Sequence, residues 1–146
     1  MTKTNHIFFY SHKNGKFACF SNFYTSPVVL NDRTWPTVEH YFQAMKTSDE
    51  LIQETIRKEK SPFKAKSLGR KVNLKSDWEE IKNDVMLKAL MAKFTQHKDL
   101  REILLSTNDA ELHEESPYDE YWGCKGQDIL GKLLMQVREA LYKTLA

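Results

Sequence analysis

The stretch that most constrains how this chain folds is residues 34–46, which join signals for a helix start to polar groups on an aromatic segment. Thr34 is predicted to be the N-cap of a helix, because its hydroxyl can accept a bond from a free backbone N–H. Pro36 suits the first helical turn, where its missing N–H costs little. A helix is therefore expected to begin here and to run through Lys46.

The polar residues of this helix follow helical spacing. Glu39, Gln43 and Lys46 recur at i, i+4 and i+7, so they lie along one face. A solvated surface would show the same pattern. The aromatic residues just upstream favour the other interpretation, in which the face points into a pocket and each polar group needs a partner or a substrate. Both interpretations remain open.

Length and composition predict an ordinary globular protein. With 146 residues, 40% of them apolar and 29% charged, we expect one domain spanning residues 1–146. The formal net charge of +2 is too small to indicate a nucleic-acid-binding surface. An apolar run able to cross a membrane and the apolar core of a signal peptide are both missing, so we expect a cytoplasmic protein with no membrane partner.

Cysteines and histidines give no sign of a disulfide framework or a metal site. Cys19 and Cys124 form no CxxC pair, and reduced thiols are expected. The five histidines are scattered, and Glu39-His40 is not part of an HExxH pair. We therefore assign no metal and no cofactor from the sequence.

The first third of the chain predicts a small antiparallel sheet. An apolar strand is expected at 6–10, and the Asn-Gly turn at 14–15 would join it to a second strand at 17–20. A third strand at 28–30 is followed by a turn at 31–32 that leads to the helix.

The remainder predicts mainly helices, so the fold class is α+β, a single compact and predominantly helical domain with a small N-terminal antiparallel sheet. Asp49 or Ser48 and then Ser61 are expected to cap two helices. Gly69 is expected to stop the second of these helices. The other expected elements are a long helix from Ser76 with a stripe of Trp78, Ile81, Val85, Ala89 and Ala92, a short helix at 99–105, an extended segment or loop at 110–115, an irregular loop at 116–125, and a last helix with a stripe of Leu130, Leu133, Leu134, Val137 and Leu141.

The loop near residue 120 combines acids with a large flat ring. Glu114, Asp119, Trp122 and Gly123 lie close together in the sequence. Carboxylates can bind sugar hydroxyls or assist bond cleavage, and an indole can stack on a base, so the loop suits a base joined to a sugar. An acidic surface loop anchored by one buried tryptophan is the alternative interpretation.

Two arginines, Arg70 and Arg138, could either contact a ligand or have a structural role. Arg70, near Lys66 and Lys71, could clamp a phosphate through both arms of its guanidinium. A solvated basic face explains these three residues equally well. Arg138, beside the apolar stripe of the last helix, is expected to be an internal ion-pair residue instead of a ligand contact.

Several of these pieces, in this order and at these separations, resemble the YbiA family, also called the NADAR family. The resemblance covers nearly the whole chain. The pieces that carry it are Phe20–Tyr24, Pro36–Lys46, Gly69–Arg70, Leu112–Glu114, Ser116–Asp119, Trp122–Gly123 and Leu130–Arg138.

The resemblance implies an N-glycosidase that needs no cofactor. Its substrates would be phosphorylated ribosylamino-pyrimidine intermediates of riboflavin biosynthesis, ADP-ribose attached to guanine in nucleic acid, or both. One departure is visible, because the family usually has Asn where this chain has Asp128, and this change could alter substrate choice. The residues carried over are Glu39, Lys46 and Asp119 as catalytic groups, and Asn22, Phe23, Gln43, Arg70, Glu114, Trp122 and Gly123 as substrate-binding groups.

Two other classes of function remain open at this stage. A non-catalytic nucleotide or ADP-ribose sensor would use the same residues to bind without turnover. A helical protein-interaction domain would have no affinity for nucleotides.

Overall fold

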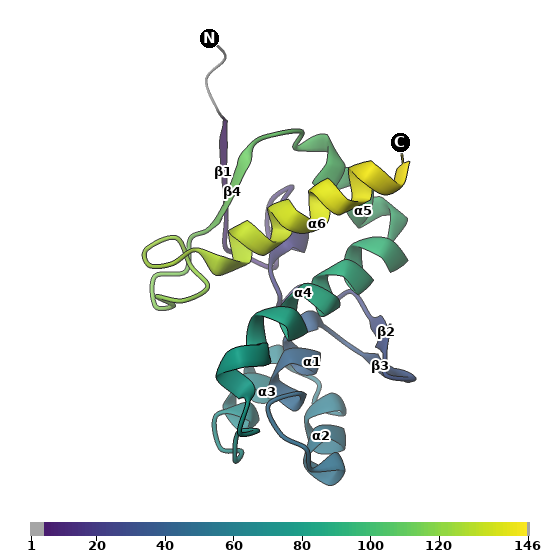
Figure 1. Cartoon of the computed structure of the whole chain (residues 1–146), viewed down its shortest axis with the longest axis vertical. Helices are drawn as coiled ribbons and strands as arrows, with labels where there is room; N and C mark the ends of the chain where they lie inside the picture. Colours follow the sequence, from purple (N-terminus) through teal and green to yellow (C-terminus); the bar gives the residue numbers. More distant parts are fainter. Residues whose placement is uncertain (1–4, 146) are drawn as a thin grey trace. The chain divides into compact units, whose positions relative to one another are not determined.

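The computed structural model describes residues 5–145, which form two compact units (Figure 1). The first unit holds residues 5–21 and 94–145, and the second holds residues 22–93. The α+β and predominantly helical class is confirmed. The elements in chain order are β1 (His6–Phe9), η1 (Ala18–Phe20), β2 (Val28–Leu30), β3 (Arg33–Trp35), α1 (Val38–Ala44), α2 (Glu50–Arg57), α3 (Pro62–Gly69), α4 (Trp78–Gln96), α5 (Lys98–Ser106), β4 (Glu111–Glu114) and α6 (Ile129–Leu145).

In the second unit, β2 and β3 form a tight antiparallel hairpin. The two turn residues, Asn31 and Asp32, have φ values of 55° and 60°. Two left-handed residues match the twist of a two-residue hairpin, and Asn and Asp tolerate this backbone. The predicted turn is confirmed, and the Trp35 indole closes the hairpin by donating to the Leu30 carbonyl at 3.0 Å.

The predicted start of α1 at Thr34 is wrong. Thr34 lies in β3, paired with Val29, so its backbone is already committed to the hairpin. Thr37 is the N-cap instead, and its hydroxyl accepts from the His40 N–H at 3.1 Å. The His40 ring bonds the Thr37 hydroxyl through Nδ1 at 2.8 Å and the Glu59 carbonyl through Nε2 at 2.9 Å. Burial lowers the pKa of His40, so this imidazole is a neutral core group.

All seven residues of α1 are buried, and the helix packs against α2 and α3. Both neighbouring helices begin at the predicted caps. The Asp49 carboxylate accepts from the Leu51 and Ile52 N–H groups, and the Ser61 hydroxyl accepts from the Phe63 N–H. The tight packing of three short helices places the side chains of α1 against their neighbours and away from bulk water.

In the first unit, the predicted hairpin from 6–10 to 17–20 is wrong. β1 pairs in parallel with β4, with His6 opposite Glu111. Residues 18–20 form a 3₁₀ turn, because Phe20 is fully buried with its ring edge-on to Phe9 and Phe94. Packing these aromatic rings in the core favours a turn at this point over a second strand.

The last helix follows its predicted stripe, and Arg138 is internal as expected. Its Nη1 donates to the Thr107 hydroxyl and to the Ala110 carbonyl, both at 2.8 Å. These acceptors are neutral, so the expected ion pair is replaced by hydrogen bonds that tie α6 to the end of α5. The residues of the stripe, all buried, are Leu130, Leu133, Leu134, Val137 and Leu141.

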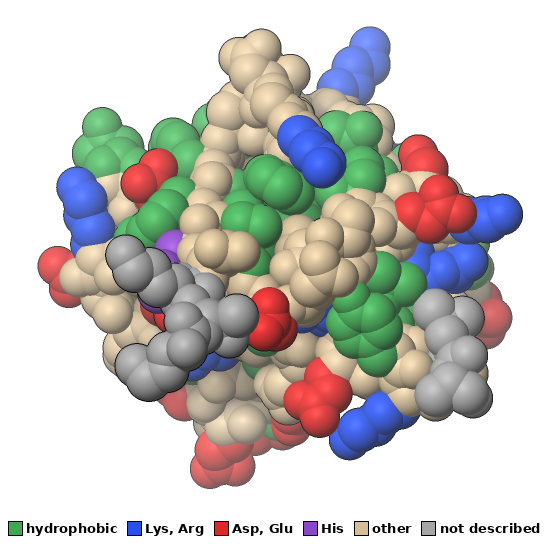
Figure 2. Space-filling model, turned by 90° about the horizontal axis from the view of Figure 1, so that it is seen from above, with side chains coloured by type: hydrophobic (Ala, Val, Ile, Leu, Met, Phe, Trp, Pro, Cys, Tyr) green, Lys and Arg blue, Asp and Glu red, His purple; other side chains and the backbone are tan. Residues whose placement is uncertain are grey.

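Charged side chains of both signs are interspersed on the face seen in Figure 2. Among the helices of residues 5–145, none combines the length and the apolar character that crossing a membrane requires.

A cluster of charged side chains, Arg33 of β3 with Glu54 and Arg57 of α2, makes the free energy of unfolding depend on pH in the acid range. Glu54 accepts from Arg33 at 3.1 Å and from two nitrogens of Arg57, at 2.8 and 2.6 Å. These bonds, those of Arg57 first, lower the pKa of Glu54 from 4.5 to about 2. Because the folded pKa lies below the unfolded one, the stabilisation is present above pH 4.5 and is lost as pH falls towards 2.

We expect Glu54→Gln to be less stable than the wild type at neutral pH, and the two proteins to converge between pH 4.5 and about 2. Urea unfolding at several pH values measures this difference. All other carboxylates titrate in both proteins. A difference in unfolding free energy that stays constant across this pH range would therefore contradict the lowered pKa of Glu54.

Candidate functional site

The polar face of α1 is buried. Glu39 and Gln43 are only 6% and 3% exposed, so the interpretation as a solvated surface is wrong for these two residues. Gln43 Nε2 donates to Glu39 Oε1 at 2.8 Å and fixes the carboxylate. The other amide atom, Gln43 Oε1, is buried and has no hydrogen-bond partner. A buried acceptor of this kind costs free energy unless a ligand satisfies it.

Gly69 of α3 makes room for the Gln43 side chain. A Cβ atom at this position would lie 1.9 Å from Gln43 Oε1 and 2.8 Å from its Cδ. The glycine was expected to stop the helix, and α3 does end there. Its second role is to let the Gln43 side chain lie against the α3 backbone, since any larger residue would push the amide away from Glu39.

Lys46 follows α1 and is half-buried. Burial lowers the pKa of its ammonium group, the Glu39 carboxylate opposes this shift, and the charges of Lys66, Arg70 and Lys82 add to it. Three other cations and the Glu39 carboxylate thus act on Lys46. Such a group of cations attracts an anion, and phosphate is the natural candidate.

The loop before β2 reaches the start of α1. The Asn22 carbonyl accepts from the Glu39 N–H at 3.1 Å, which satisfies one of the free donors of the helix start. Asn22 Oδ1 is a second buried acceptor without a partner. The neighbouring Phe23 ring lies 5.8 Å from Lys66 Nζ and packs edge-on against Phe63 at 4.7 Å.

The structure therefore gathers six of the predicted site residues, together with Lys66 and Lys82, within the second unit. We call this group of residues the α1–α3 site. It joins a carboxylate, two buried unpaired acceptors and a group of cations. Its members are Asn22, Phe23, Glu39, Gln43, Lys46, Lys66, Arg70 and Lys82.

The four other predicted site residues belong to the first unit. Asp119 Oδ1 accepts from the backbone N–H groups of Tyr121 at 3.0 Å and Trp122 at 2.8 Å, so this carboxylate shapes the loop. Trp122 is only half-buried, unlike Trp35 and Trp78 in the core. The indole is therefore partly exposed.

Two further residues of this loop segment have backbone roles. A Cβ atom at Gly123 would lie 2.6 Å from the Asp119 carbonyl, so the loop requires glycine there for close approach. Glu114, at the end of β4, is half-buried, and its carbonyl accepts from the Cys124 N–H at 2.6 Å. Catalysis by Asp119 and ligand binding by Glu114, Trp122 and Gly123 stay predictions.

Two features of the α1–α3 site were not predicted. Lys82 lies 36 residues after Lys46, on a long helix with two other lysines, and no local pattern distinguishes it. The closeness of Gly69 to Gln43 depends on how two helices pack, which spacing along the chain does not encode. The family motifs Pro36–Lys46 and Gly69–Arg70 are the signal that could have linked them.

Comparison with known proteins decides the family. The NADAR domain family matches residues 8–142. The chain belongs to the NADAR family. It is 47% identical over 141 residues to N-glycosidase YbiA of Escherichia coli strain K12, covering 92% of this chain and 88% of that protein. It is also 41% identical over 139 residues to an N-glycosidase of Nostoc punctiforme, covering 89% of each chain.

Other NADAR relatives extend the comparison. The NMR structure of E. coli YbiA superposes with a TM-score of 0.90 at 44% identity, covering 99% of this chain and 89% of that one. The chloroplastic riboflavin biosynthesis protein PYRR of Zea mays is 38% identical over 165 residues. That match covers 98% of this chain but only 26% of the maize protein. The resemblance stated from the motifs is thus confirmed.

Proposed function

We propose that this NADAR protein hydrolyses the bond between ribose C1 and an amine nitrogen in a phosphorylated ribosylamino-pyrimidine of riboflavin biosynthesis, with ADP-ribose on guanine as the other candidate substrate. The general activity rests on relatives matched over most of their length, and the chain is an enzyme of the N-glycosidase class. The maize relative, named for riboflavin biosynthesis, supports the choice of pyrimidine.

The observation that carries the proposal is the pairing of Glu39 with a group of cations. Cleavage of an N-glycosidic bond passes through a state in which the ribose carries positive charge. A fixed carboxylate lowers this barrier by stabilising the charge or by moving a proton, and Gln43 holds Glu39 for that role. The cations around Lys46 suit the phosphate of the same substrate.

Two buried acceptors suit the ribose itself. Gln43 Oε1 and Asn22 Oδ1 both lack a donor in the structure. Ribose hydroxyls are donors, so a bound sugar would remove two unfavourable buried groups. Phe23 lies beside the cations and would cover one side of the bound molecule.

Lys46 would act as a covalent catalyst. Its neutral amine bonds to ribose C1 as the bond from C1 to the leaving nitrogen breaks. Glu39, protonated at the start of this step, gives its proton to the leaving nitrogen and then takes one from the Lys46 nitrogen. Opening of the ribose ring then yields an imine between ribose C1 and Lys46. Water hydrolyses this imine to free ribose phosphate and regenerates the Lys46 amine. The lowered pKa of Lys46 favours the neutral form that this step needs.

For the first unit, taken by itself, we propose the roles that the family resemblance implies. Trp122 would stack on a base, Glu114 and Gly123 would contact substrate, and Asp119 would act as an acid or base. We also propose a cytoplasmic location, because Cys19 and Cys124 do not form a disulfide with each other, as expected in a reducing compartment.

Substrate choice is tested by incubating the protein with the ribosylamino-pyrimidine phosphate and, separately, with DNA bearing ADP-ribosylated guanine. Chromatography of released base and sugar measures turnover. We expect the free nucleotide to be the better substrate. Faster release from the DNA would show that ADP-ribosylated guanine, and not the pyrimidine nucleotide, is the preferred substrate. The assignment to the N-glycosidase class would be unaffected.

Arg70→Ala should raise the KM for the phosphorylated substrate by about tenfold to a hundredfold, since charge-assisted bonds contribute roughly 1.5–3 kcal/mol. The KM for the dephosphorylated analogue should hardly change, because the guanidinium fork matches phosphate. Lys71→Ala, one residue further along, is the control. Equal losses on both analogues would assign Arg70 a structural role.

A further inference from the structure

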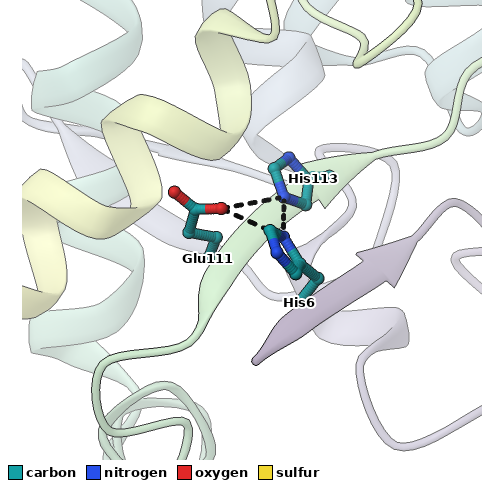
Figure 3. Close-up of side chains that lie close together, drawn as sticks. All are labelled: His6, Glu111 and His113. Atoms are coloured by element: carbon teal, nitrogen blue, oxygen red, sulfur yellow. Dashed lines mark hydrogen bonds and ion pairs between the residues drawn. The ribbon is translucent and has the colours of Figure 1, made fainter. Parts of the chain in front are cut away.

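Outside the residues used above, one cluster of potential ligands lies in the first unit, on neighbouring strands (Figure 3). His6 comes from β1, and Glu111 and His113 come from β4. Alternate residues of a strand share a face, so Glu111 and His113 both point to the side where His6 lies. Parallel pairing of strands more than a hundred residues apart creates this cluster, which is why the spacing of histidines did not predict it.

The three ligand atoms lie close enough together to bind one tetrahedral metal ion. His6 Nδ1 lies 3.0 Å from Glu111 Oε2 and 3.1 Å from His113 Nε2, and the third edge, from His113 Nε2 to Glu111 Oε2, is 3.9 Å. A tetrahedral ion with bonds of about 2.0–2.1 Å requires edges of about 3.3–3.4 Å. The average edge here is about 3.3 Å.

A second carboxylate orients the ring of His113. Asp128 Oδ2 lies 2.5 Å from His113 Nδ1, and a carboxylate at this distance accepts the ring proton. The Nε2 lone pair is then free to face the other two ligands. Ligating histidines usually donate their second N–H to a carboxylate in this way, which orients the ring and strengthens the ligand.

Packing holds these groups in position. The His113 ring stacks on His6 at 5.3 Å and on Phe8 at 4.9 Å between centroids. A Cβ atom at Gly131 would lie 2.0 Å from the Leu112 carbonyl, so this glycine lets the start of α6 approach β4 and bring Asp128 to the ring. The site is thus supported from β1, β4 and α6.

We propose that His6, Glu111 and His113 bind one zinc ion, with Asp128 as the supporting carboxylate and water as the fourth ligand. Two imidazoles and one carboxylate are a ligand set that zinc prefers. On binding, the proton of His6 Nδ1 passes to solvent, and the three lone pairs bond the ion. The ion ties β1 to β4, on the face opposite Leu112 and Glu114.

The proposal is tested by zinc titration of the metal-free full-length protein in a calorimeter near neutral pH. We expect one equivalent to bind with release of protons, and cobalt in its place to give the intense visible bands of a tetrahedral centre. His6→Ala and His113→Ala should lose the site. Asp128→Asn, which keeps the shape but not the charge, should weaken binding about 10–100-fold.

The matched control is His97→Ala, which removes a histidine of the same unit outside the cluster and should keep the affinity of the wild type. His6 is about half exposed, so its replacement leaves folding intact, and a circular dichroism spectrum checks this for each variant. Absence of binding, an octahedral cobalt spectrum, or equal affinity in the wild type and both histidine variants would overturn the proposal.

Discussion

Lys46→Arg should reduce kcat by roughly a thousandfold or more, a loss of the size seen when a covalent nucleophile is removed. Arginine keeps the positive charge beside Glu39 but stays protonated and cannot attack ribose C1. Phosphate binding should therefore survive, and KM should change little. The matched control is Lys66→Arg, which makes the same change at another cation of the α1–α3 site and should retain activity within a few-fold.

Two measurements identify the nucleophile. Borohydride added during turnover should trap a ribose adduct, and mass spectrometry should locate it on Lys46. Activity should also rise with pH through the pKa of Lys46, which burial holds below the usual 10.5, because only the neutral amine reacts. Full activity of Lys46→Arg without any trapped adduct would exclude the imine and leave hydrolysis to Glu39 and water.

Gly69→Ala should destabilise the protein by about 1–3 kcal/mol, although alanine normally stabilises a helix relative to glycine. The new methyl group would lie 1.9 Å from Gln43 Oε1. Gln43 is buried, so its amide can escape only by leaving Glu39. Urea unfolding should show the loss of stability, and kcat should fall as the carboxylate loses its support.

A double-mutant cycle separates this clash from other effects. Gln43→Ala removes the group that the new methyl would meet, so Gly69→Ala should cost much less stability in that background. Ser67→Ala, at an exposed site of the same helix, is the control and should change stability by less than about 0.5 kcal/mol. A Gly69→Ala protein that is more stable than the wild type would contradict the packing described here.

The sequence predicted features encoded by nearby residues. Asp49 and Ser61 cap helices as expected, and the turn at Asn31 and Asp32 is correct, because each depends on a few consecutive side chains. The stripe on α4 was only partly right. Trp78 and Ala89 are buried, but Met86 and Leu90 fill the core where Ile81 and Val85 were expected, since neighbouring elements decide which face of a long helix is covered.

Features that depend on distant parts of the chain were not predictable in the same way. Thr34 has the chemistry of a cap, but pairing with Val29 keeps it in a strand. The same limit applies to the candidate site. Glu39, Gln43 and Lys46 follow from helical spacing, whereas Lys82 and the space provided by Gly69 arise only when helices pack.

Multiple-turnover release of free base from the ribosylamino-pyrimidine phosphate, by the wild type and by Glu39→Gln, tests the central claim most directly. We expect catalytic release by the wild type and a loss of roughly 10²–10⁴-fold in Glu39→Gln, because the amide cannot carry the proton or stabilise the charge. The folded state of the variant is checked by urea unfolding. Tight binding of both candidate substrates by the wild type without release of base would contradict the account and identify the protein as a nucleotide sensor.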